Sequence, residues 1–251
     1  MQPPRLFSRS ISEGRQILSP EESHHAAAVL RLKSGDEVVL FDGAGTEGFG
    51  EFERPHRRVA EVSVSKVITR PFELPRKLTL AVSMPKAHRQ GFLIEKCTEL
   101  GLAAIWPMIA AHSVGRPRAA AIDKWARRAI EAAKQAGRAW VPEIAQPRGF
   151  REAIENIGRF DGAGIADLGD SDSDVPSFLR AAPARGSIIV FIGPEGGWTD
   201  EERARAVALG VRRISLAPTT LRTETAAVAV CAAVAMQSPR QCDEPVSHSA
   251  P

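Results

Sequence analysis

The chain has 251 residues, of which 43% are hydrophobic and 25% charged, a composition typical of a folded globular protein. It excludes a fibrous or disordered chain, and no apolar run approaches the roughly 18 residues that a membrane span needs. The N-terminus lacks the apolar core of a signal peptide, which predicts a cytoplasmic protein with no membrane partner. Cys97, Cys231 and Cys242 are too few for a disulfide framework, and neither they nor the six histidines are spaced as metal ligands, so no metal is expected.

The net charge is +3, but its distribution along the chain is uneven. Residues 71–150 carry 13 Lys and Arg against 6 Asp and Glu, whereas residues 1–70 carry 10 against 10 and residues 151–251 carry 10 against 14. A basic block of this kind indicates a surface that faces a polyanion. A solvated helix face accounts for the charge equally well.

A small β-rich domain is expected over residues 1–70. Alternating stretches at 36–45, 46–53 and 57–68 are separated by turns that contain Gly or Asp-Gly. Such close spacing of short strands predicts a barrel. Two prolines among charged residues at 71–77 predict a linker.

The remainder of the chain alternates between strand and helix patterns. Strands are expected at 78–84, 103–110, 162–168, 186–193 and 215–218, and long helices at 88–101 and 122–140. This alternation predicts an α/β domain over residues 78–240 with a mostly parallel sheet. Residues 241–251 are expected to form a flexible tail.

Two polar loops follow strands in the second half of the chain. The first, GPEGG at 193–197, lies between an apolar run and the capping-box pattern of Thr199 and Glu202, so it joins a strand to a helix. It lacks the Lys of a phosphate loop, and Glu195 would repel phosphate, so a ligand that is neutral or cationic there fits better. Taken alone, such a loop is more often only a tight turn.

The second loop strengthens the ligand interpretation. Residues 216–237 repeat the same layout, with a strand end, a turn at Pro218 and an alanine-rich helix. Arg222, Thr223 and Glu224 gather on the first turn of that helix. In open α/β sheets, ligands bind beyond the carboxyl ends of the strands, where both loops are expected.

Together the segments IGPEGGWTDEE (192–202), LRTETAAVAV (221–230) and EKCTELG (95–101) resemble the SPOUT-superfamily methyltransferases that modify N3 of a uridine in small-subunit (16S) ribosomal RNA. Further matches are HHAAAVLRLKSGDEV (24–38), FDGAG (41–45), Lys86 and WARRAIEAAKQAGRAWVP (125–142), so the resemblance covers nearly the entire chain. Ala217 and Thr219 stand where the family more often has Gly and Arg, and Ala111-His112 stand where an acidic-basic pair is typical.

This resemblance implies a PUA-like β-barrel that helps to grip RNA and a C-terminal SPOUT α/β domain with a deep trefoil knot, which pairs as a homodimer. It also implies S-adenosyl-L-methionine as the cofactor, held by the backbone of three loops. In this chain the implied contacts are Met84, Ile192, Gly193, Gly196, Leu216, Pro218 and Leu221.

The chemistry of the reaction suggests further roles. Methylation at N3 requires loss of the N3 proton or stabilisation of the developing anion. Arg222 is expected to stabilise charge on the uracil oxygens, and Glu224 or Glu195 to orient the base or accept the proton, unless these carboxylates only cap turns. The expected RNA contacts are Arg31, Lys86, Arg89, Lys96 and Arg138, each of which taken singly is a surface charge by default.

Two alternatives remain open from the sequence. A methyltransferase of the same fold could act on transfer RNA or on another ribosomal position. A non-catalytic RNA-binding assembly factor could retain the fold without binding the cofactor. A dinucleotide-dependent oxidoreductase is excluded by the absence of a G-x-G-x-x-G fingerprint.

Overall fold

The N-terminal part of the molecule is a five-stranded sheet. The structure is a computed structural model that describes residues 3–117, 119–167 and 171–237, so the expected tail and Cys242 lie outside it. The strands are β1 (Arg5–Phe7), β2 (Gly14–Ile17), β3 (Asp36–Phe41), β4 (Thr46–Arg54) and β5 (Glu61–Thr69), in the order β1-β3-β4-β5-β2. The three expected strands are present as β3, β4 and β5. Their pairing is an open path with β1 and β2 at its ends, so the closed barrel remains a prediction.

One short helical segment covers this sheet. Helix α1 (Pro20–His24) begins at the N-cap Ser19, whose side chain accepts a hydrogen bond from the Glu22 N–H, and continues into the π-helix η1 (His25–Val29). The core beneath includes Leu6, Leu40, Phe52 and Val62, all fully buried.

The C-terminal part is built on an eight-stranded sheet in which every pairing is parallel. Its order is β11-β13-β10-β12-β6-β7-β8, with β9 also paired to β7. The strands are β6 (Arg76–Ser83), β7 (Ala104–Ile109), β8 (Glu143–Ile144), β9 (Arg148–Gly149), β10 (Gly162–Ala166), β11 (Ser173–Asp174), β12 (Gly186–Ile192) and β13 (Arg212–Ser215). The predicted α/β architecture is therefore confirmed. The strand expected at 215–218 is displaced, because β13 ends at Ser215 and the following residues form a loop.

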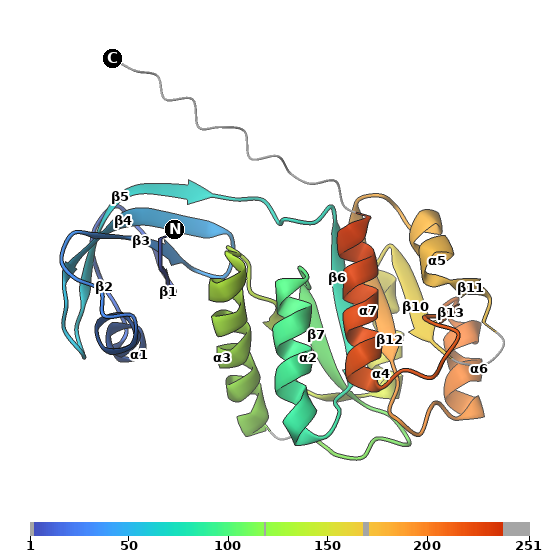
Figure 1. Cartoon of the computed structure of the whole chain (residues 1–251). Coiled ribbons are helices and arrows are strands. Elements are labelled where there is room, and N and C mark those ends of the chain that lie inside the picture. Colours follow the sequence, from blue (N-terminus) through green and yellow to red (C-terminus); the bar gives the residue numbers. More distant parts are fainter. Residues whose placement is uncertain (1–2, 118, 168–170, 238–251) are drawn as a thin grey trace.

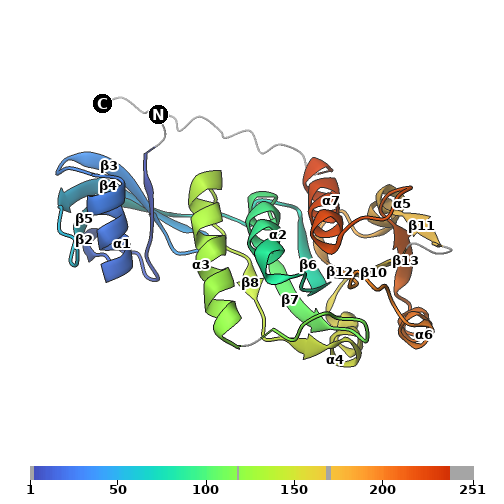
Figure 2. The ribbon, with the colours of Figure 1, turned by 60° about the horizontal axis from the view of Figure 1, so that its bottom comes forward.

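Helices cover both faces of this sheet (Figures 1 and 2). On one face α3 (Ala119–Ala136), α2 (Ala87–Glu99) and α7 (Thr223–Met236) lie side by side, and α5 (Val175–Ala181) packs next to α7. On the other face lie α4 (Phe150–Glu155), followed by the 3-10 turn η2 (Ile157–Arg159), and α6 (Asp200–Ala208). Helix α3 ends earlier than the expected 140 because Gly137 adopts φ 69° and stops it.

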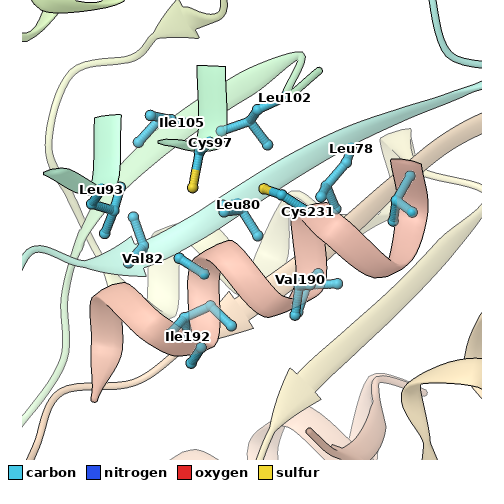
Figure 3. Packing of buried hydrophobic residues seen from close by; sticks show 14 of the residues in the cluster. Leu78, Leu80, Val82, Leu93, Cys97, Leu102, Ile105, Val190, Ile192 and Cys231 are labelled. Carbon is cyan, nitrogen blue, oxygen red and sulfur yellow. The ribbon is translucent and has the colours of Figure 1, made fainter. Parts of the chain in front are cut away.

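Two hydrophobic cores form because side chains alternate across the sheet. Ile188, Val190 and Ile192 of β12 contribute to the core beneath α2 and α7, whereas Ile189 and Phe191 contribute to the core beneath α4 and α6. Strands buried on both faces read as continuous apolar runs, which is why β12 was predictable. Figure 3 shows the first of these cores.

Two thiols meet inside that core. The side chains of Cys97 on α2 and Cys231 on α7 point toward each other in Figure 3, and both are buried as free cysteines. Burial raises the pKa of the Cys231 thiol well above its ordinary value, and the hydrogen bond with Cys97 adds to this effect. These cysteines therefore act as small apolar residues between two helices.

The N-terminal sheet is tied to the second part of the chain by polar contacts. Lys134 of α3 is paired with Glu22 of α1, and these side chains are only 4% and 10% exposed. An Arg5 N–H donates to the Arg138 carbonyl (3.0 Å), and Trp140 forms bridges with the loop between β3 and β4. Helix α3 is thus the element against which the N-terminal part is fixed.

Within the described ranges, none of the helices has the length and hydropathy that a bilayer span requires. The same ranges also bring together no group of three His, Cys, Asp or Glu side chains able to hold a metal ion.

Candidate active site

A cavity opens at the carboxyl ends of three neighbouring strands, β13, β10 and β12. The loop after each strand forms part of its wall, together with the first turns of α6 and α7. Of the predicted cofactor contacts, Ile192, Gly193, Leu216 and Leu221 line this cavity, as does Glu195. The position agrees with the general location of ligands in open α/β sheets.

Three predicted contacts lie outside the cavity wall. Met84 directly follows β6, which β12 separates from β10, and its side chain is 7% exposed within the hydrophobic core. Pro218 is exposed on the surface of its loop. Gly196 faces His112 instead, because a Cβ on Gly196 would lie 2.9 Å from the His112 Cβ. The third wall of this cavity is therefore the loop after β10, and a cofactor contact from the turn after β6 stays a prediction.

The loop after β10 supplies residues that the sequence analysis missed. Asp167 lines the cavity at 8% exposure, and its Oδ2 accepts a hydrogen bond from the Arg203 Nε at 3.0 Å. The Trp198 Nε1 donates to the Ala166 carbonyl at 2.8 Å, which joins this loop to the one after β12. An acidic residue near the end of the strand expected at 162–168 was the available signal.

The GPEGG loop is held in place by hydrogen bonds to its carbonyl groups. The Thr223 hydroxyl donates to the Gly193 carbonyl at 3.1 Å, and the Gly197 N–H donates to the Pro194 carbonyl at 2.9 Å. His112 Nδ1 lies 3.0 Å from the Gly196 carbonyl and 3.1 Å from the Gly197 carbonyl. Because a carbonyl only accepts, this geometry requires a proton on Nδ1.

Close packing explains one glycine of this loop, and backbone conformation explains another. A Cβ on Gly193 would lie 2.9 Å from the indole ring of Trp198, so a side chain there would push into the cavity wall. Gly197 adopts φ 71°, a conformation that favours glycine.

The predicted capping box starts α6 directly after the loop. Thr199 Oγ1 accepts from the Glu202 N–H at 3.2 Å, and Glu202 Oε2 accepts from the Thr199 N–H at 2.9 Å. The other oxygen of Glu202 accepts from the Ala111 N–H at 2.9 Å. One buried carboxylate therefore anchors both α6 and the loop after β7 beside the cavity.

The three predicted catalytic residues lie at the entrance to α7 and at the cavity wall. Arg222 is the N-cap residue of α7, is exposed, and forms no ion pair within the described ranges. Glu224 and Glu195 are brought together by Arg89, whose Nη1 lies 3.4 Å and 3.0 Å from their respective Oε1 atoms. The second oxygen of Glu224 is buried and has no hydrogen-bond partner in the described part of the chain.

The predicted RNA contacts differ widely in exposure. Arg31 and Lys86 are exposed. Lys96 is paired with Glu99 (2.8 Å) and Glu95 (2.9 Å), and these hydrogen bonds raise the pKa of its amine. Arg138 is only 7% exposed and donates to the Thr98 carbonyl and to Glu73, so its guanidinium is engaged within the protein and an RNA contact from it stays a prediction. Burial of an arginine could not be inferred from charge alone.

A parallel sheet with a cavity at its strand ends occurs in many enzyme classes, and the sequence matches identify this chain as one of the RNA methyltransferases. The sequence matches the family described as RNA methyltransferase domain over residues 72–235 and the RNA methyltransferase PUA domain over residues 18–65. The chain belongs to the ribosomal RNA small subunit methyltransferase E family. It is 30% identical to the protein of that name from Synechocystis, over 86% of this chain and 71% of the relative, and 30% identical to that of Mycobacterium tuberculosis, over 89% and 87%.

Solved structures share the fold. The Neisseria gonorrhoeae ribosomal RNA small subunit methyltransferase E bound to S-adenosyl methionine superposes with a TM-score of 0.86 at 30% identity, covering 94% of this chain and 98% of that one. The Legionella pneumophila methyltransferase Lpg2936 in complex with the same cofactor gives a TM-score of 0.84 at 29% identity, covering 93% and 97%.

Proposed function

We propose that this chain methylates N3 of a uridine in small-subunit ribosomal RNA, with S-adenosyl-L-methionine as the methyl donor. The observation that carries the proposal is the cavity walled by the loops after β10, β12 and β13 in a chain of this family. The relatives are named for the small-subunit RNA, and the two solved structures described above contain the cofactor.

The residues present fit this cofactor. The wall offers backbone groups of the GPEGG loop and the apolar side chains of Leu216 and Leu221, and Gly193 keeps the wall clear of side-chain atoms. Glu195, which would repel a phosphate, is compatible with a sulfonium cation. When bound, the cofactor supplies an electrophilic methyl group.

Residues at the start of α7 supply the side chains that act on the uracil base. We assign to the unpartnered Glu224 oxygen the role of accepting the uracil N3 proton, which leaves the N3 lone pair free to form the new bond to carbon. Arg222, at the N-terminus of α7, stabilises the charge that develops on the uracil oxygens, and the helix dipole adds to it. Alignment of N3 with the methyl group supplies much of the rate.

RNA binding requires an unpaired target, because N3 lies on the Watson–Crick edge of the base. We assign phosphate contacts to Arg31 and Lys86, which are exposed on the two parts of the chain. We assign RNA binding to the PUA domain, which we propose to be a small barrel over residues 1–70. The activity belongs to the cytoplasm, where the ribosome is assembled.

We further propose a deep trefoil knot and a homodimer. The knot is supported by the return of the chain from β13, near one edge of the sheet, to α7, which packs on β6 and α2 across the middle of the sheet. The dimer is supported by exposed apolar side chains on α2 and α7, namely Phe92 and Met236.

Cofactor binding tests the proposal before any RNA is added. Gly193→Ala is expected to weaken the affinity for S-adenosyl-L-methionine at least about tenfold in calorimetry, because the added methyl collides with Trp198. Gly158→Ala is the matched control, since a Cβ at Gly158 meets nothing within 4 Å. Wild-type protein that binds no cofactor would contradict the proposal and favour the assembly-factor alternative.

A further inference from the structure

Arg89 stands between two carboxylates that come from different loops. Its Nη1 lies 3.0 Å from Glu195 Oε1 and 3.4 Å from Glu224 Oε1. The three side chains together carry one net negative charge, so the guanidinium charge is already compensated within the protein. A phosphate at this position would have to compete with two nearby anions.

The guanidinium is presented from a fixed support. Arg89 lies in the first turn of α2, and its N–H donates to the Lys86 carbonyl at 2.8 Å. The next residue, Gln90, donates to the Pro85 carbonyl at 2.8 Å and accepts from the Trp125 Nε1 at 3.2 Å. Helix α2 also packs directly against α7, which carries Glu224. These contacts hold in place the helix turn that carries Arg89.

The two carboxylates differ in their surroundings. The Glu195 side chain is 40% exposed and lines the cavity, whereas the Glu224 side chain is 9% exposed and lies outside the wall. Only Arg89 pairs with Glu224 among the described residues. The guanidinium thus connects the cavity loop to the first turn of α7, and it leaves one buried Glu224 oxygen without a partner.

Resting on the function proposed above, we propose that Arg89 is a positioning residue for methyl transfer and not a phosphate contact. It fixes the Glu224 carboxylate so that the unpartnered oxygen faces the substrate base, and it holds the Glu195 loop in its cofactor-binding shape. Without the guanidinium, the two carboxylates repel each other across the entrance to α7.

The kinetic test compares Arg89→Met, which keeps the aliphatic stem, with Lys86→Ala. Arg89→Met is expected to lower kcat about 100-fold and to change the KM for small-subunit RNA by less than about twofold. In Arg89→Met, kcat/KM should depend on salt concentration as it does in the wild type. Arg89→Lys, which can pair with one carboxylate at a time, recovers part of kcat. Lys86→Ala shows the behaviour of a phosphate contact, with raised KM and a salt slope smaller by about one.

A rescue experiment separates this inference from the proposed function, because it needs no RNA. Adding Glu195→Gln to Arg89→Met removes the repulsion, so the double variant should melt at a higher temperature and bind S-adenosyl-L-methionine more tightly than Arg89→Met alone. A wild type that binds cofactor but methylates no RNA would overturn the proposed function without affecting this comparison. Unchanged kcat with raised KM in Arg89→Met, or no gain from Glu195→Gln, would overturn the positioning role.

Discussion

At the scale of single residues, Arg222 is the side chain whose removal should separate chemistry from cofactor binding. Arg222→Ala is expected to lower kcat about 100- to 1,000-fold, because charge on the uracil oxygens loses its stabilising partner. The affinity for S-adenosyl-L-methionine should stay within about twofold, since Arg222 lies outside the cavity wall. Arg212→Ala, at the start of β13, is the matched control and should retain activity. Calorimetry that shows lost cofactor binding in Arg222→Ala would contradict the assignment.

The buried thiol of Cys231 predicts a dependence of stability on alkaline pH. Its pKa is raised in the folded chain, so the unfolded chain loses this proton first as the pH rises above the ordinary value of 9.0. The contribution to stability is thus complete below pH 9 and falls above it by about 1.4 kcal/mol per pH unit until the folded thiol ionises. Urea unfolding between pH 8 and 10.5 should give a shallower slope for Cys231→Ala. The chain contains no tyrosine, so no phenol group titrates in this pH range. Identical slopes would refute the prediction.

Some residue roles could be predicted from the sequence and others could not. The capping box was predictable because Thr199 and Glu202 have a fixed spacing and a local geometry. The burial of Arg138 was not, because it depends on Glu73 and on the Thr98 carbonyl, both distant in the sequence. Asp167 was missed because its place in the cavity follows from the strand order, which local patterns do not give.

At the scale of elements, the start of α6 is the feature most open to a stability test. Thr199→Ala removes the acceptor for the Glu202 N–H and is expected to lower the free energy of unfolding by about 1 kcal/mol. Thr199→Ser keeps the hydroxyl and should restore most of the loss. Urea unfolding of the three proteins provides the measurement. A Thr199→Ala variant as stable as the wild type would show that the cap contributes nothing.

Helices and strands were predictable where they are long and where their apolar residues form a continuous run or recur at a regular spacing. The runs that became β6 and β12 and the helices α2 and α3 have strong patterns of this kind. Strand β1 has three residues and depends on its pairing with β3, so no local pattern identified it. Helix α1 was also missed, although Ser19 followed by Pro20 and two glutamates is an ordinary helix start.

At the scale of the whole molecule, the buried pair of Lys134 and Glu22 joins the two parts of the chain. Lys134→Met leaves the Glu22 carboxylate buried without its counter-ion and is expected to destabilise the fold by about 3–5 kcal/mol. Adding Glu22→Gln removes the buried charge and keeps an acceptor for the Phe7 N–H, so the double variant should recover much of the loss. Arg151→Ala, on an exposed ion pair of α4, is the control and should change stability by less than about 0.5 kcal/mol. A Lys134→Met variant that unfolds like this control would contradict the argument.

The assembly of the site also belongs to this scale. Three strand ends, the start of α2 and the start of α7 meet only because the parallel sheet orders β13, β10, β12 and β6 as neighbours. The sequence located the two loops with the strongest motifs, but their meeting with Asp167 and Arg89 depended on this topology. We propose that this combined site transfers a methyl group to N3 of a uridine.

Mass mapping of the RNA product shows directly whether the methyl group reaches N3 of a uridine. Small ribosomal subunits that lack the modification are incubated with the protein and isotopically labelled S-adenosyl-L-methionine, and the RNA is digested and analysed. Label is expected as 3-methyluridine at one site, with a rate at least about 100-fold lower for Glu224→Gln. Label on another atom or in another RNA, or no label from protein that binds the cofactor, would contradict this proposal.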